Sequence, residues 1–164
     1  MSYNFKRVVI ATGGTVATSG NCKIHTFTGP GTFTVCSVST NCAAENTVSY
    51  LVVAGGGSAS GYYGAGGAGG FRLSNGSCTP NTSPLAAPAA LPVTATGYPI
   101  TVGAGGTENP SAPAVGGYKG NNGSNSVFAG SSTITSAGGG YGDSTPEGPD
   151  ASPGGPGGSG GSAG

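Results

Sequence analysis

The residues best suited to chemistry in this chain are one histidine, His25, and four cysteines, Cys22, Cys36, Cys42 and Cys78. His25 follows Cys22 by three positions, a spacing that suits two metal ligands, but no second close pair completes a zinc site. The even number of cysteines allows three disulfide pairings, with free thiols as the alternative. Cys22 and Cys36 flank a predicted hairpin, and Cys36 and Cys42 bracket a short loop. The sequence therefore does not select one pairing.

Arrangements for catalysis find little support. His25 falls in a predicted strand, where packing against the opposite arm of a hairpin is the favoured role. The nearest acidic cluster, Asp143, Glu147 and Asp150, lies in a Pro/Gly-rich tail, which does not supply the fixed carboxylate spacing of glycoside hydrolysis. Residues 52–57 (VVAGGG) superficially resemble a dinucleotide-binding turn. That motif needs a further glycine at position 60, which is Ser60, and a helix that the following residues cannot begin. We expect no enzymatic activity, no cofactor and no metal.

Glycine dominates the chain after residue 54, with 31 of the 36 glycines. Ordering so much glycine costs backbone entropy that few large side chains can offset. Such segments either stay flexible or pack backbone against backbone, as extended chains with three residues per turn do. The five basic and five acidic residues form no basic stripe, and no apolar run reaches about 18 residues. We expect neither nucleic-acid binding nor membrane insertion.

The predicted fold is mostly β: an N-terminal antiparallel sheet or sandwich, then a glycine-rich region of short strands and extended polyglycine-like segments. Residues 23–28 and 32–36 form the best hairpin, because β-branched and aromatic residues flank a Gly-Pro-Gly turn. Residues 47–54 predict a strand buried on both faces. The Asn-Gly pairs at 75–76 and 122–123 predict turns. The predicted domains are a docking and folding domain over 1–54, a glycine-rich domain over 55–142 and a Gly/Pro-rich tail or linker over 143–164.

The candidates for exposed contact residues are tyrosines beside glycines, where no neighbouring side chain hides them: Tyr62, Tyr63, Tyr118 and Tyr141. Aromatic rings with a polar tip suit recognition surfaces and stack on sugars. The alternative role is to cover the edges of a glycine bundle or to fill an oligomer interface. Both roles stay open from the sequence.

Several stretches follow a pattern of apolar strands and glycine runs: residues 14–35, 50–57, 66–72, 101–106 and 116–117. Together they resemble the glycine-rich domain of bacteriophage virion appendages, over roughly residues 12–142. The resemblance implies a β-structured start and a glycine-rich region in fibres or tips that recognise the host surface. In some tip adhesins of this kind, such regions pack as layered polyglycine helices with exposed loops. The four cysteines and residues 77–90 depart from the family pattern.

The sequence therefore favours a non-enzymatic virion structural protein, a tail-fibre or tail-tip subunit that contributes to host-surface recognition. Its expected partners are other virion proteins, further copies of itself, with a trimer favoured, and a host glycan or outer-membrane protein. A capsid decoration or head-fibre protein is the alternative. A third reading, an ice-binding bundle of glycine helices, requires a regular Gly-x-x period, whereas the glycines here run as GGG, GAGG and GG.

Overall fold

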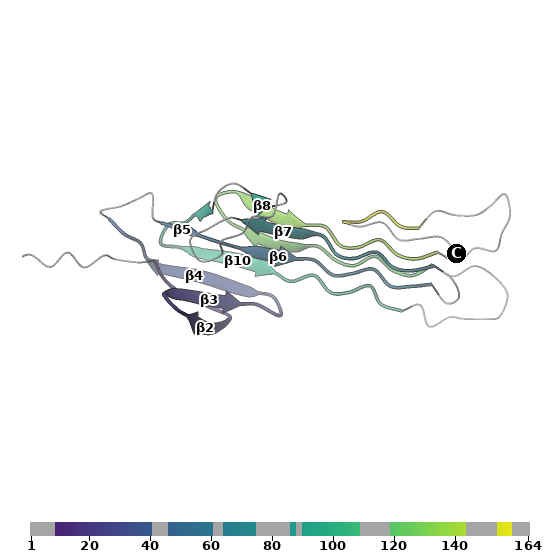
Figure 1. The fold of residues 1–164 in the computed structure, drawn as a ribbon, viewed down its shortest axis with the longest axis horizontal. Coiled ribbons are helices and arrows are strands. Elements are labelled where there is room, and N and C mark those ends of the chain that lie inside the picture. Colours follow the sequence, from purple (N-terminus) through teal and green to yellow (C-terminus); the bar gives the residue numbers. More distant parts are fainter. Residues whose placement is uncertain are drawn as a thin grey trace, which may run out of the picture. The chain divides into compact units, whose positions relative to one another are not determined.

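A computed structural model describes residues 9–40, 46–60, 64–74, 86–87, 90–108, 119–143 and 154–158. Figure 1 shows that its regular elements are strands, and the described residues contain no helix. It follows that no described helix is long and apolar enough to cross a membrane. The prediction of a mostly β fold with antiparallel sheets is confirmed.

The chain divides into two compact units, each assembled from three separate stretches. The first unit takes residues 1–51, 73–100 and 128–134, and the second takes 52–72, 101–127 and 135–164. The predicted boundary after residue 54 lies close to residue 52, where the chain first passes from the first unit to the second. The chain then returns to the first unit twice, which a linear division into 1–54, 55–142 and 143–164 does not describe.

Within the described residues, twelve strands form four sheets. The largest sheet has the order β1-β4-β10-β11-β12, with β1 at Ile10–Thr12, β4 at Gly31–Ser37, β10 at Gly97–Thr101, β11 at Ser126–Ala129 and β12 at Thr133–Ser136. The smaller sheets pair β2 (Thr15–Ser19) with β3 (Cys22–Thr26), β5 (Thr47–Val48) with β9 (Leu91–Pro92), and β6 (Leu51–Val53) with β7 (Phe71–Ser74) and β8 (Ala86–Ala87). Strand β4 pairs antiparallel with both β1 and β10, and the short β7–β8 pair is parallel.

The predicted hairpin over residues 23–36 is wrong, because β3 and β4 belong to different sheets. Strand β3 pairs instead with β2, from Thr15 opposite Thr26 to Ser19 opposite Cys22. Gly20, at φ 56°, occupies the first central position of this two-residue turn, as a type II′ turn requires. The local turn therefore pairs β3 with the preceding strand before the Gly-Pro-Gly segment is reached.

An aromatic cluster forms the core of the first unit. The rings of Phe33, Tyr98 and Phe128 lie with centroids 5.9–6.4 Å apart, and two of the three pairs meet edge to face. The Tyr98 hydroxyl accepts a hydrogen bond from the Thr94 N–H at 2.7 Å, which satisfies its polar end. Aliphatic side chains, Val35, Leu91 and Val93, complete the buried set. This small core agrees with the low content of large apolar residues.

The predicted double-sided burial of residues 47–54 is also wrong. That stretch forms two short strands, β5 and β6, in different sheets. In β6, Leu51 is 60% exposed and Val53 is 53% exposed. The continuous apolar run therefore forms an edge strand, β6, and not a strand buried on both faces.

Candidate functional site

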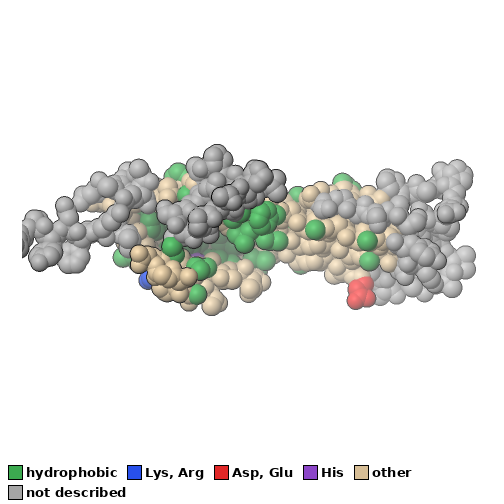
Figure 2. Space-filling model, viewed as in Figure 1, with side chains coloured by type: hydrophobic (Ala, Val, Ile, Leu, Met, Phe, Trp, Pro, Cys, Tyr) green, Lys and Arg blue, Asp and Glu red, His purple; other side chains and the backbone are tan. Residues whose placement is uncertain are grey.

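Six extended segments make up most of the described part of the second unit. They are residues 54–60, 64–70, 102–108, 119–125, 137–143 and 154–158, and we call them together the glycine bundle. In Figure 1 they appear as waved traces that lie side by side. Figure 2 shows mostly tan atoms over them, because backbone and small polar groups form their surface.

Backbone hydrogen bonds join the segments with a period of three residues. Gly55 and Ser58 donate to residues 124 and 121, at 3.1 and 2.9 Å. Gly67 and Gly70 donate to residues 140 and 137, both at 2.7 Å. The same step of three recurs between the segments 119–125 and 137–143 and between 137–143 and 154–158. Three residues per turn, with bonds to neighbouring chains only, is the geometry of packed polyglycine helices.

Space, and not backbone conformation, explains most glycines of the bundle. None of its glycines has a positive φ; the glycines with a positive φ in the described part of the chain, Gly13, Gly14 and Gly20, lie in the first unit. A Cβ placed on Gly139 would overlap the carbonyl oxygen of Gly67 and lie 2.7 Å from the Gly57 nitrogen. A side chain there would push neighbouring backbones apart, so glycine is the only residue that fits.

Two segments are central. Residues 54–60 bond to the segments 64–70, 102–108, 119–125 and 137–143. Residues 137–143 bond to 54–60, 64–70, 119–125 and 154–158. Each central segment therefore has four bonded neighbours, compared with two for a strand inside a flat sheet. The bundle is a three-dimensional lattice of backbones with almost no side chains inside it.

Consecutive segments run in opposite directions. Gly57 bonds to Gly67 whereas Ser60 bonds to Gly64, so the first two segments are antiparallel. The segments 54–60 and 137–143 run in the same direction, since Gly139 and Gly142 donate to residues 55 and 58. The segments 102–108 and 119–125 are antiparallel, since residue 124 bonds to residue 104 and residue 121 to residue 107. The segments 119–125 and 154–158 both run antiparallel to 137–143.

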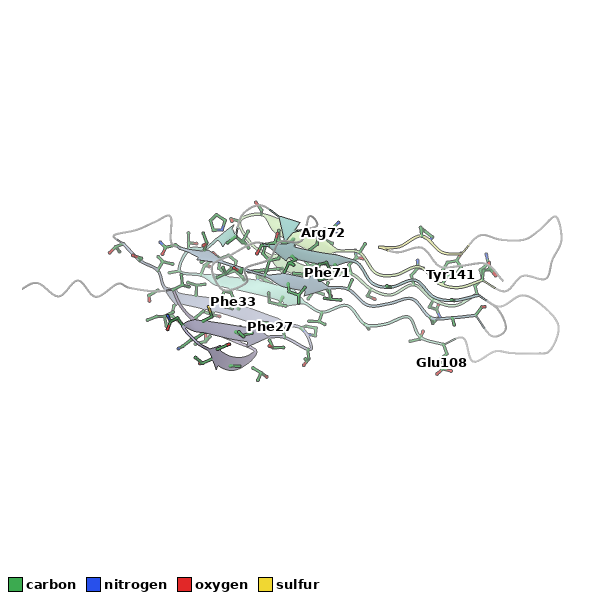
Figure 3. All side chains as sticks on the ribbon, viewed as in Figure 1. Phe27, Phe33, Phe71, Arg72, Glu108 and Tyr141 are labelled. Carbon is green, nitrogen blue, oxygen red and sulfur yellow. The ribbon has the colours of Figure 1, made fainter. Side chains whose placement is uncertain are left out.

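This alternation gathers the ends of the segments. Residues 61–63, 109–118 and 144–153 each join a segment to the next one, which runs back. The described residues that flank these three connections therefore lie at one end of the bundle, which we call the loop end: Ser60, Gly64, Glu108, Lys119, Asp143 and Gly154. Figure 3 shows the labelled Glu108 and Tyr141 at this end.

Charged and aromatic side chains meet at the loop end. The Lys119 ammonium lies 3.5 Å from an Asp143 carboxylate oxygen and 5.9 Å from the centre of the Tyr141 ring. Asp143 is 0% exposed, and its two carboxylate oxygens accept no hydrogen bond. Lys119 is half exposed, and its backbone forms an antiparallel bridge with that of Asp143. This pair ties the segments 119–125 and 137–143 together where they approach the loops.

Polar side chains supply hydrogen bonds at the edges of the lattice. The side-chain oxygens of Asn122 and Asn125 accept from the N–H groups of Tyr141 and Gly138, at 2.8 and 2.9 Å. The Ser58 hydroxyl accepts from the Asn121 N–H at 2.7 Å and donates to a carbonyl of the third segment. These residues were not predicted from the sequence. Their spacing of three, at 122 and 125, was the available signal.

The structure describes one of the four tyrosines for which the sequence left open a recognition role or a role at the bundle edges or an oligomer interface. Tyr141 is half-buried at the loop end, with its backbone bonded to Asn122 and Gly155. Tyr62, Tyr63 and Tyr118 lie outside the described residues, in two of the connections that begin at this end. The Asn-Gly pair at 122–123 was predicted to turn, but it continues an extended segment.

The cysteines fall into different states. Cys22 is disulfide-bonded, whereas Cys36 is free and exposed. Both pairings suggested for Cys36, with Cys22 and with Cys42, are therefore wrong. Strand β4, which carries Cys36, pairs in another sheet from the strand that carries Cys22. Cys42 and Cys78 lie outside the described residues.

His25 is a packing residue. Its Nδ1–H donates to the Gly13 carbonyl oxygen at 2.8 Å, and its ring meets Phe33 edge to face at 5.1 Å. Phe33 belongs to β4, so His25 does pack on the following strand, although across sheets. Of the predicted acidic cluster, Glu147 and Asp150 lie outside the described residues. Within the described part of the chain, no three His, Cys, Asp or Glu residues gather as metal ligands.

Residues 26–164 match the family described as glycine-rich domain. The chain belongs to this family. The match covers most of the chain and spans the whole glycine bundle, which agrees with the predicted resemblance to a glycine-rich domain. No curated protein and no solved structure matches the chain.

Proposed function

We propose that this glycine-rich domain protein is a non-enzymatic structural protein of a bacteriophage virion. Its role is that of a tail-fibre or tail-tip subunit that contributes to host-surface recognition. The observation that carries the proposal is the alternating direction of the six bundle segments. It brings the bases of three connections to one end of a lattice whose interior has almost no side chains.

A lattice of this kind suits presentation rather than catalysis. The hydrogen bonds between its segments are made mainly by backbone atoms of the segments themselves, so the connections can change in sequence without altering the frame that holds them. The connections and the loop end carry all four recognition tyrosines, Tyr62, Tyr63, Tyr118 and Tyr141. Aromatic side chains with a polar tip bind both sugars and protein surfaces, which fits a host glycan or an outer-membrane protein. Several copies in a homotrimer would strengthen a weak single contact.

The position on the particle is tested by immunogold electron microscopy with antibody against residues 55–140. Gold at the fibres or the tail tip supports recognition. Gold over the head would favour the alternative, a capsid decoration or head-fibre protein. Intact particles without gold would contradict a virion role altogether.

The recognition role is tested by adsorption of particles that carry a changed connection. Replacing residues 109–118 by a Gly/Ser sequence of equal length is expected to reduce adsorption at least tenfold while particles assemble normally. The double variant T18A/K23A alters two exposed residues opposite each other on β2 and β3, and serves as the matched control. Equal adsorption by both variants and the parent would refute the role of this connection.

One observation favours a second function. The bonds of the bundle repeat every three residues, which is the regularity an ice-binding bundle of glycine helices would need. Thermal hysteresis of the purified chain, measured against the buffer and against the unfolded chain, decides between the two. A freezing-point depression found only for the folded chain would favour ice binding.

A further inference from the structure

Asn122 occupies an unusual chemical position in the bundle. Among the described residues it is the asparagine that is followed by glycine. Such a pair is the most easily deamidated one in proteins, because the following residue has no Cβ to hinder cyclisation. Asn122 is also solvent-exposed, so burial does not protect it.

The reaction needs two atoms to meet. The Gly123 backbone nitrogen attacks Asn122 Cγ, and a new C–N bond closes a five-membered succinimide ring. The side-chain nitrogen leaves as ammonia and carries away the proton of the Gly123 N–H. Water then opens the ring and gives either aspartate or isoaspartate, whose backbone is longer by one methylene group.

The closed bundle holds both atoms away from this reaction. The Gly123 N–H donates to the Gly139 carbonyl oxygen at 2.9 Å. The Asn122 side-chain oxygen accepts from the Tyr141 N–H at 2.8 Å. Both bonds go to the segment 137–143, so cyclisation requires that the segments 119–125 and 137–143 separate first. Protection therefore comes from the lattice.

The lattice also requires the residue that makes Asn122 labile. A Cβ on Gly123 would overlap the Gly55 carbonyl oxygen, so position 123 must be glycine. Isoaspartate at 122 would shift every following atom along the chain. The bonds that Gly120 and Gly123 make to the segment 137–143, three residues apart, could not then form together.

We propose that Asn122 is a deamidation site which the closed bundle protects and which an open bundle converts irreversibly. Each opening long enough for cyclisation risks a permanent loss of register. A chain in which Asn122 is converted is therefore one whose bundle has opened. This inference does not depend on the recognition role proposed above.

The test incubates the full chain at pH 8, folded or in urea, and follows Asn122 by proteolysis and tandem mass spectrometry. We expect deamidation to be at least about tenfold slower in the folded chain, in proportion to the small population of the open state. Asn125 is the internal comparator, because its side chain makes the same kind of bond but serine follows it. Equal rates at Asn122 in both conditions would overturn the proposal.

A second arm tests irreversibility. Chains held in urea until Asn122 is converted are returned to buffer, and amide hydrogen exchange of the bundle glycines is measured. We expect lasting loss of protection in the isoaspartate fraction. N122Q, which keeps the amide but cyclises far more slowly, is expected to regain the protection that it had before urea. Full recovery of the isoaspartate form would show that the conversion does not lock the bundle open.

Discussion

Replacing Gly139 by alanine should break the bundle at its centre. A Cβ at this position would overlap the Gly67 carbonyl oxygen and lie 2.7 Å from the Gly57 nitrogen. These two atoms form a hydrogen bond of 2.9 Å, so the new methyl group would enter that bond. The backbone conformation itself is not the obstacle, because Gly139 has no positive φ.

The magnitude follows from two contributions. Inserting a methyl group into a closely packed interior costs about 1–3 kcal/mol. Losing the Gly57–Gly67 bond, with its donor and acceptor left in the interior, costs about 1–3 kcal/mol more. The expected loss is therefore about 2–6 kcal/mol, a large part of the roughly 5–15 kcal/mol that a domain has in total.

Gly105 provides the matched control. A Cβ there would have the Gly56 carbonyl oxygen as its nearest neighbour, at 3.7 Å, which is an ordinary contact. G105A should therefore be neutral, or stabilising by about 0.4–1 kcal/mol, because alanine lowers the entropy of the unfolded chain. The two variants make the same chemical change in the same lattice and differ only in available space.

Native-state hydrogen exchange of the bundle amides measures the difference locally. A loss of about 2 kcal/mol or more should speed exchange in G139A by at least about 25-fold, whereas G105A should exchange like the parent or more slowly. Parent-like protection in both variants would refute the view that available space dictates these glycines. The same loss of protection in both variants would also refute it, since it would indicate a general cost of side chains in the bundle.

Three further predictions concern other parts of the chain. F33A removes the ring that meets His25, Tyr98 and Phe128, and should cost about 3–5 kcal/mol in urea unfolding; a loss under 1 kcal/mol would contradict the aromatic core. Without reductant, iodoacetamide should label Cys36 but not Cys22, and subsequent reduction should cost about 2–4 kcal/mol; labelled Cys22 in peptide maps would argue against its disulfide. S58A should cost about 1 kcal/mol, because the Asn121 N–H loses its acceptor, and unchanged exchange at Asn121 would disprove this.

The sequence predicted the fold where local chemistry decided it. β-branched and aromatic runs predicted strands, and the shortage of large side chains left two alternatives for the glycine-rich segments, flexibility or packing of backbone against backbone. The sequence misled where a choice between neighbours was needed. Residues 23–28 could pair with either flanking strand, and the positive φ of Gly20 settles the pairing in favour of β2.

The candidate site was harder to predict for a related reason. Hydrogen bonds between polyglycine segments depend on position and not on residue type, so glycine runs do not reveal which segments meet. Asn122 was predicted in a turn because Asn-Gly pairs favour turns. Gly123 instead lies in an extended segment, where it packs so closely against the Gly55 carbonyl that no side chain fits. Tyr141 was proposed as a contact residue because it lies beside glycines, but the sequence does not show that Lys119, far from it along the chain, lies over its ring.

The scarcity of side chains inside the described bundle also limits how this protein can evolve. In an ordinary core, a change in one side chain can be offset by an opposite change in its neighbour, since total volume is what matters. Glycine has no smaller substitute, so an enlargement at Gly139 or Gly123 has no neighbour that can shrink in response. Mutational tolerance should thus be sharply divided: nearly none at the inner glycines, and wide freedom at outward positions such as Gly105. We therefore expect the inner glycines to stay constant among diverging relatives while the connecting segments vary.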